Sequence, residues 1–351
     1  MNIYYFLIFN ILLLGIVLRP QRTVTRKMVY CFIISIILII VSGLRHLSVG
    51  NDTWNYVNIF YRYNQMSINE LFQNHFGIEF GYVILNKFIG SLSLGYQWLL
   101  LFTAVVFTLS VSKFIYDYSN DVVLSYLVLF SFSFFQFSMT GLRQTLAISI
   151  VIFGIKYALD KKLIKFSLVV LLASTFHQSA LVAFFIYLAT YFKMSKLMKV
   201  SSIVLIAIVY VLRNSIVNFL FMFIPDGRYN YLSDGGGETV LLVVFLIFIV
   251  GLMFHKNYDK VSRYANFEYG MIILGILFQV FTPVQNIFFR IAMYFTIILV
   301  VFIPNLFSGF KSSERLIMKY MIYIALLVQY FIFTKNAAGV VPHEFFLLSS
   351  F

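Results

Sequence analysis

The sequence predicts an all-α, polytopic integral membrane protein, a helical bundle with about 12 transmembrane helices. The first reason is composition: 61% of the 351 residues are hydrophobic and only 11% are charged, whereas a soluble domain carries about 25% charged residues. The second is the presence of long apolar runs without a charged residue, such as 4–18 and 31–41. These runs lack the alternation of barrel strands, so helices must satisfy the backbone polar groups in lipid.

The expected spanning helices follow the apolar runs in order. They cover residues 2–18, 28–44, 95–113, 121–139, 142–158, 163–176, 178–192, 198–222, 239–254, 267–282, 287–307 and 316–334. The segment 79–92 is apolar but short and contains Lys87, so we expect a re-entrant or interfacial helix there. We expect a single transmembrane domain over residues 1–351, because no polar linker divides the chain.

Basic residues set the expected orientation in the membrane. If the first cluster, residues 19–27, is cytoplasmic, the N-terminus is external. External loops then lie near 45–77 and 225–238, and the C-terminal tail from 335 is external. Of the 26 lysines and arginines, all but eight fall on the cytoplasmic side, as the positive-inside rule requires. The net charge of +13 is therefore a topological signal, and we expect no nucleic-acid partner.

The eight basic residues outside this pattern are candidates for function. They are Arg45, Arg62, Lys87, Arg143, Arg213, Arg228, Arg290 and Lys335. Six are arginines, the side chain suited to bidentate recognition of phosphate or carboxylate. Arg143 follows a turn at 138–141, and Arg290 lies one turn into an expected helix. Each of these two is either an anion-binding residue or a structural anchor at the membrane surface.

His177 and Asp52 are the candidates for acid–base chemistry on the same expected side. His177 lies among small polar residues between two short spans, where a neutral imidazole is either a general base or a partner of helix-end carbonyls. Asp52 precedes an expected interfacial helix near 55–63. Its side chain either caps this helix or contacts a sugar or phosphate. Trp54 and Tyr56 would offer stacking faces for such a contact.

The sequence lacks the common motifs for metal binding, nucleotide binding and a serine nucleophile. No HExxH, CxxC or paired-histidine spacing indicates a metal, and neither a P-loop nor a GxSxG elbow is present. We therefore expect no metal and no cofactor. The turn 225–227 leads into Arg228 and Tyr229, an Arg-aromatic pair that is either a ligand contact or an interface anchor. The remaining chemistry is an arginine-rich external site, which suits a lipid-linked pyrophosphate in charge and in depth.

Four stretches together resemble the EpsG family, a Wzy-like group of exopolysaccharide and O-antigen repeat-unit polymerases. They are Gly43-Leu44-Arg45 through Gly50-Asn51-Asp52-Thr53 to Tyr56, then Leu142-Arg143-Gln144-Thr145-Leu146-Ala147, then Ala173-Ser174-Thr175-Phe176-His177-Gln178-Ser179-Ala180, and finally Gly227-Arg228-Tyr229 with Tyr231. Near the end, Val341-Pro342-His343-Glu344-Phe345 is similar to a family element in which tyrosine stands at the position of His343.

The resemblance implies a membrane glycosyltransferase of polysaccharide biosynthesis on the outer face of the bacterial cytoplasmic membrane. Such an enzyme would transfer a growing glycan from undecaprenyl pyrophosphate to a new lipid-linked repeat unit, in exopolysaccharide, capsule or O-antigen assembly. Besides the lipid-linked oligosaccharide and the bilayer, the expected partners are a flippase and a chain-length regulator. A flippase of lipid-linked sugars, an O-antigen-type ligase and a non-catalytic scaffold are the alternatives, and the lack of internal repeats weakens the first of them.

The site residues that we expect from this resemblance fall into two groups. His177 would be the catalytic base, with Asp52 as the rival. The expected substrate-binding residues are Arg143, Arg290, Arg45, Arg228, Tyr229 and Gln144. Among these, Arg143 and Arg290 would hold the donor pyrophosphate, and Arg45 and Arg228 would make secondary contacts.

Overall fold

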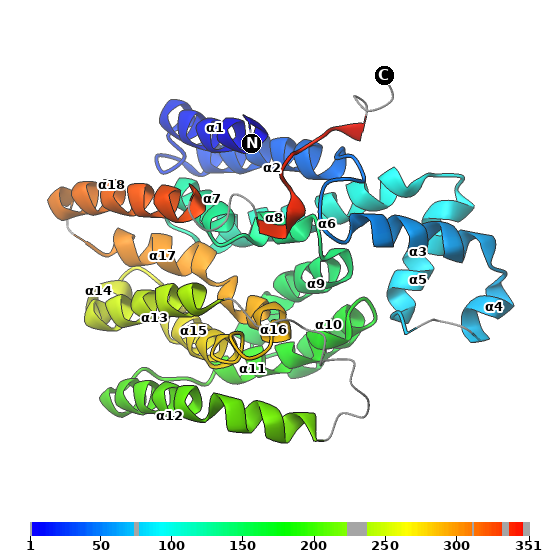
Figure 1. Cartoon of the computed structure of the whole chain (residues 1–351). Coiled ribbons are helices and arrows are strands. Elements are labelled where there is room, and N and C mark those ends of the chain that lie inside the picture. The colour runs from blue at the N-terminus through cyan, green and yellow to red at the C-terminus, as the bar shows by residue number, and fades with distance from the viewer. Residues whose placement is uncertain (1, 74–76, 223–236, 311, 332–336, 347–351) are drawn as a thin grey trace. The chain divides into compact units, whose positions relative to one another are not determined.

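The computed structural model describes residues 2–73, 77–222, 237–310, 312–331 and 337–346, and every named element in them is a helix (Figure 1). The expected all-α class is confirmed. The chain divides into two compact units, and each is described by itself. Unit 1 comprises Met1–Gly154, Ser167–Leu181 and Lys311–Phe351, and unit 2 comprises Ile155–Phe166 and Val182–Phe310. Whether both belong to a single transmembrane domain stays a prediction.

Unit 1 contains the N-terminal helices and the C-terminal segment. Its elements are α1 (Asn2–Leu18), α2 (Val24–Gly43), α3 (Thr53–Gln65), α4 (Ile68–Gln73), α5 (Phe80–Ser91), α6 (Tyr96–Tyr118), α7 (Val122–Ser131), α8 (Phe134–Ser138), α18 (Ser312–Gln329) and the 3₁₀ helix η3 (Ala337–Gly339). Figure 1 shows α1 beside α2 and α7 beside α18, in agreement with their contacts. Helices α9 (Leu142–Leu159) and α10 (Leu163–Ser174) lie partly in each unit, as does the 3₁₀ helix η1 (Gln178–Ala183).

Unit 2 is built around α15, which contacts four other helices. Its elements are α11 (Phe184–Ala189), α12 (Lys196–Phe221), α13 (Glu238–Met253), α14 (His255–Tyr258), α15 (Ala265–Gln279), α16 (Ile287–Thr296) and α17 (Leu299–Ser308). Helix α15 packs against α11, α12, α13 and α16. Tyr269 lies at the centre of this core, where it stacks on His255 with ring centroids 5.1 Å apart and donates to the carbonyl of Gly251.

Every expected helix in the described residues is present, but three are broken or change their type. The expected helix 121–139 divides into α7 and α8 at Ser133, which adopts a left-handed φ of 59°. The expected helix 287–307 divides into α16 and α17, which are bent by 44°. The expected helix 178–192 begins as η1 before α11. Apolar composition is the same on both sides of each break, so hydropathy alone does not reveal it.

The lengths of the helices support a membrane protein without confirming the number of spans. In the described residues, four helices are long and apolar enough to cross a bilayer, and the bent pair α16 and α17 adds a fifth. Long helices also expose aliphatic and aromatic side chains, among them Phe32 and Ile36 on α2 and Val204 and Val211 on α12. Exposed apolar surface of this kind is what lipid solvates. The expected segment 79–92 forms α5, with 12 residues, which is too short for a usual span.

Candidate functional site

The carboxylate of Glu79 is the partner of three groups from two separate segments of unit 1. Nη1 of Arg143 donates to Oε2 at 2.6 Å, Nδ1 of His177 lies 3.0 Å from Oε1, and the backbone N–H of Gln178 donates to Oε1 at 3.0 Å. The Glu79, Arg143 and His177 side chains are 17%, 25% and 22% exposed. We call these three residues the Glu79 cluster. The cluster is mostly buried, but part of each side chain is accessible to solvent.

Local structure around Gly81 explains why Glu79 meets His177. Glu79 is the residue before α5, and it does not cap that helix with its side chain. The N–H of Gly81, two positions later, donates to the carbonyl of Thr175 at 2.8 Å. A Cβ added to Gly81 would lie 2.3 Å from the hydroxyl oxygen of Thr175. Glycine thus lets the first turn of α5 dock on the turn that precedes η1, which brings Glu79 beside His177.

Arg143 is held by the start of α9. Its neighbour Leu142 and Leu146, one turn further on, are fully buried in a core cluster with Tyr56 and Phe60 of α3. The Tyr56 hydroxyl is close enough to the guanidinium to interact with it. In the described part of the chain, the buried Nε–H of Arg143 has no hydrogen-bond acceptor. The packing therefore fixes the base of the side chain and leaves donor capacity on the guanidinium.

The charges of the cluster are complementary. Burial on its own would raise the pKa of the Glu79 carboxyl, but hydrogen bonds from His177 and Gln178 and the charge of Arg143 outweigh it and lower the pKa to about 2. Glu79 is therefore ionised throughout the physiological range. A carboxylate that accepts from Nδ1–H of a neutral histidine leaves the lone pair on Nε2, the arrangement that a general base requires.

Arg45 is buried, with 1% of its surface exposed. Its guanidinium donates to three backbone carbonyls, those of Ser42, Val49 and Met139. Burial lowers its pKa to about 10, which leaves it charged at neutral pH. In this structure Arg45 therefore ties the end of α2 to the following loop and to the turn before Arg143, and its expected contact with phosphate stays a prediction.

Asp52 lies where that loop enters α3. Its backbone N–H donates to the hydroxyl of Thr140 at 3.2 Å, but its side chain makes no capping hydrogen bond to α3. Gly50 has a φ of +98°, and a Cβ there would lie 2.5 Å from the carbonyl oxygen of Met139. Glycine is required at this position, because both the backbone conformation and the close approach exclude a side chain. The loop thereby places Asp52 next to the turn that leads into Arg143.

The C-terminal segment is hydrogen-bonded to the beginning of the same loop. His46 N–H donates to the carbonyl of Glu344 at 2.8 Å, and Phe346 N–H donates to that of Leu44 at 2.9 Å. Tyr4 of α1 donates to the carbonyl of Val340 at 3.0 Å. The beginning and end of the chain therefore lie at the same end of unit 1, together with Arg45 and Asp52. The expected external position of both termini stays a prediction.

The remaining expected site residues do not contribute to the Glu79 cluster as the structure describes it. Gln144 follows Arg143 and is buried. Arg290 is exposed on α16 of unit 2 and is therefore described separately from Arg143. Arg228 and Tyr229 lie outside the described residues. In the described residues, no three His, Cys, Asp or Glu side chains come together as metal ligands would.

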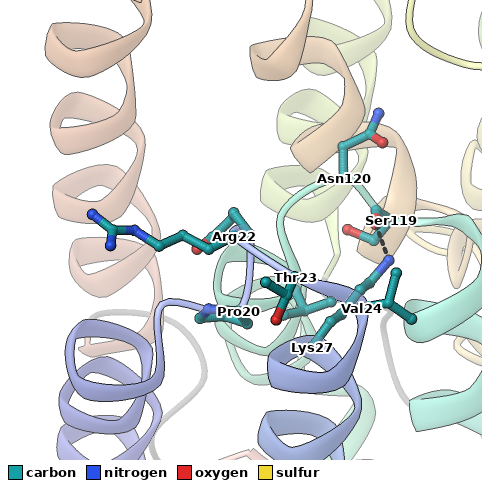
Figure 2. A pocket seen from close by; sticks show the side chains of 9 residues that line it. Pro20, Arg22, Thr23, Val24, Lys27, Ser119 and Asn120 are labelled. Carbon is teal, nitrogen blue, oxygen red and sulfur yellow. Dashed lines mark hydrogen bonds between the residues drawn. The ribbon is translucent and has the colours of Figure 1, made fainter.

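A cavity of about 310 Å³ opens at the other end of α2, away from the Glu79 cluster (Figure 2). Pro20, Thr23 and Lys27 line it from the α1–α2 connection, and Ser119 and Asn120 line it from the α6–α7 connection. Figure 2 shows Lys27 directed at Ser119, whose carbonyl accepts its Nζ at 2.7 Å, while Arg22 extends away. The cations are not gathered around one centre, so this cavity is not an anion site of the expected kind.

Glu79 is the functional residue that the sequence analysis missed. Its partners Arg143 and His177 lie 64 and 98 positions away along the chain. The available signal was an acidic residue on the expected external side, immediately before an apolar segment that carries few charges. That signal marks Glu79 as unusual, but only the fold reveals that an arginine and a histidine meet at its carboxylate.

Comparison with known proteins gives one family. The model of the EpsG family matches residues 28–345 of the chain. This range includes the whole Glu79 cluster, Arg45, Asp52 and the C-terminal segment. No curated protein and no solved structure matches.

Proposed function

Because this chain belongs to the EpsG family, which indicates a polysaccharide polymerase-type membrane protein, we propose that it is a repeat-unit polymerase with its active site at the Glu79 cluster. The enzyme transfers a growing glycan from undecaprenyl pyrophosphate to a new lipid-linked repeat unit on the outer face of the bacterial cytoplasmic membrane. The observation that carries this proposal is one carboxylate that orients both an arginine and a histidine at the surface of unit 1.

Arg143 serves the leaving group in this reaction. As the bond between the anomeric carbon and the pyrophosphate oxygen breaks, its electron pair passes to the pyrophosphate, and the guanidinium stabilises the added negative charge. Glu79 engages Nη1 of Arg143 and fixes its plane, while the buried Nε–H supplies a further donor. A buried donor without an acceptor destabilises the protein by about 1–3 kcal/mol. An anionic oxygen of the substrate that accepts this hydrogen bond would remove that cost.

His177 serves the acceptor. Its Nε2 accepts the proton of the sugar hydroxyl whose oxygen forms the new bond to the anomeric carbon, while Nδ1–H stays with Glu79. Asp52 remains the rival base, because it borders the same turn. The orientation of the imidazole by Glu79 favours His177. Cleavage of the bond between the anomeric carbon and the pyrophosphate drives the transfer, so no nucleotide sugar takes part, and the proposal includes no obligatory metal.

Reconstitution tests this function. Purified protein in lipid is given undecaprenyl-pyrophosphate-linked repeat units from the host, with chelator and without nucleotide sugar, and the products are separated on a gel. A ladder of regularly spaced glycans supports the polymerase. Transfer of a finished glycan to a different acceptor without a ladder would indicate a ligase, and movement of the intact unit across the bilayer would indicate a flippase. Either result contradicts the proposal.

A further inference from the structure

The exposed face of α3 has a composition unlike that of the lipid-facing helices. Its exposed side chains are Trp54, Asn55, Asn58, Tyr61, Arg62 and Gln65. Not one of these six is aliphatic, whereas α2 and α12 expose mainly aliphatic and phenyl side chains. Trp54 and Tyr61 are 56% and 50% exposed. Since they are seven residues apart, they lie on one face about 10 Å from each other along the axis.

The apolar face of α3 is covered by protein. Tyr56 and Phe60 are buried in the core cluster with Tyr82 of α5 and Leu99 of α6. A helix that lies on a membrane instead inserts its apolar face into the boundary of the acyl chains. The expectation of an interfacial helix is therefore corrected in one respect: the apolar face of α3 packs against α5 and α6. The expected stacking role of Tyr56 also changes, because its ring is only 7% exposed.

Aromatic rings interspersed with amides are chemically complementary to sugars. The flat C–H face of a pyranose stacks on an indole or phenol ring, and its hydroxyls bond to amide groups. Asn58 lies between Trp54 and Tyr61 on the same face, so amide groups accompany both rings. The separation of the rings exceeds the width of a single sugar, which suits an oligosaccharide.

The buried face of the same helix contacts the Glu79 cluster. Helix α3 begins beside Thr140, three residues before Arg143, and its buried Tyr56 interacts with the guanidinium. A glycan whose reacting end is at Arg143 would pass around α3 to reach Trp54 and Tyr61. We propose that the exposed face of α3, centred on Trp54, Asn58 and Tyr61, binds the glycan portion of the substrate. The inference rests on the proposed function for its location and adds a binding surface for sugars that carry neither lipid nor phosphate.

The chain has only two tryptophans, Trp54 and Trp98, which makes a direct test available. Trp98→Phe protein in lipid nanodiscs emits from Trp54 alone. The probe is oligosaccharide released by partial acid hydrolysis of the host polysaccharide, free of lipid and phosphate. We expect a saturable change of Trp54 emission, about tenfold weaker binding in Tyr61→Ala, and no change in Trp54→Phe protein, which emits from Trp98. Tyr320→Ala, an exposed tyrosine of α18, is the matched control and should bind normally.

Two outcomes would overturn the inference. One is oligosaccharide binding, measured by isothermal titration calorimetry, that is unchanged after Trp54→Ala with Tyr61→Ala. The other is strong quenching of Trp54 by brominated lipid without any response to sugar, which would make α3 a membrane anchor. Arg143→Ala separates this inference from the proposed function, because it should abolish transfer and retain binding of the free oligosaccharide. Sugar binding without any ladder would leave this surface standing while the polymerase assignment fails.

Discussion

Oε1 of Glu79 and Nδ1 of His177 lie 3.0 Å apart, although the two residues are separated by 98 positions in the chain. The same carboxylate holds Arg143 through its other oxygen. Glu79 thus fixes the orientation of both side chains that the proposed reaction uses. Partners of this kind act by setting the tautomer and the position of a catalytic histidine.

Replacement of Glu79 by glutamine tests this relationship. The side chain keeps its shape but loses its charge, so His177 and Arg143 lose their shared anion. We expect transfer to fall about 10- to 100-fold at normal protein levels, the usual effect of removing such an orienting group. Glu70→Gln is the control, since Glu70 is exposed and its hydrogen bonds are with nearby Ser67. Full activity of Glu79→Gln would show that its carboxylate has no orienting role.

The low pKa of Glu79 predicts how stability changes in acid. Its folded pKa of about 2 lies below the ordinary value of 4.5, so the folded state binds fewer protons than the unfolded state in this range. The stabilising contribution is complete above pH 4.5 and declines as the pH falls towards 2. Thermal unfolding is measured in detergent at pH 7, 4 and 3. The difference in melting temperature between wild type and Glu79→Gln should become smaller as the pH falls. A constant difference at all three values would contradict this account.

Removal of the Arg45 guanidinium should destabilise the fold. Arg45→Met keeps most of the buried volume but leaves three carbonyls without their donor. We expect a loss of about 3 kcal/mol in the free energy of unfolding, measured by denaturant titration in detergent micelles. Arg62→Met, on the exposed face of α3, should change stability by less than about 0.5 kcal/mol. Equal stability of Arg45→Met and wild type would refute the structural role.

His343 predicts a pH-dependent attachment of the C-terminal segment. Burial, followed by the charge of Arg45, lowers its pKa from 6.5 to about 4. The docked segment therefore holds a neutral imidazole, and its docking free energy is complete above pH 6.5 and declines as the pH falls towards 4. Hydrogen exchange at Phe346, corrected for intrinsic rates, should accelerate between pH 7 and pH 5.

Two neighbouring groups complicate that measurement. Nδ1 of His46 lies 3.5 Å from Oε2 of Glu344, and this pair also holds the C-terminal segment. His343→Gln isolates the contribution of His343, because glutamine does not titrate. As the pH falls from 7 to 5, the exchange rate of wild type should rise relative to that of His343→Gln. A difference that does not vary between pH 7 and pH 5 would rule out His343 as its source.

Hydropathy predicted the positions of the long helices because they lie in continuous apolar runs of the sequence. It could not predict the break at Ser133, where the backbone is left-handed although neither proline nor glycine marks the change. The amphipathic pattern of α3 predicted a helix and a buried face. It could not tell whether lipid or protein covers that face, since both are apolar.

The sequence selected two of the side chains that meet at the Glu79 cluster, but it did not reveal their contacts. Arg143 and His177 stood out because charged and titratable groups are rare at the ends of apolar helices. Arg45 stood out for the same reason, but the sequence did not reveal that its donors are directed at backbone carbonyls. Glu79 could not be found without the fold, because its importance lies in the convergence of α5, α9 and the 173–178 turn.

The most direct test of the account is the rate of ladder formation by Arg143→Ala in reconstituted lipid, compared with wild type at equal protein levels. Lys113→Ala is the matched control, because it removes a cation from an exposed pair with Asp117 near the opposite end of α6. The account predicts that Arg143→Ala lowers the rate at least about 100-fold while Lys113→Ala retains it. A normal ladder from Arg143→Ala would contradict the assignment of the Glu79 cluster as the active site.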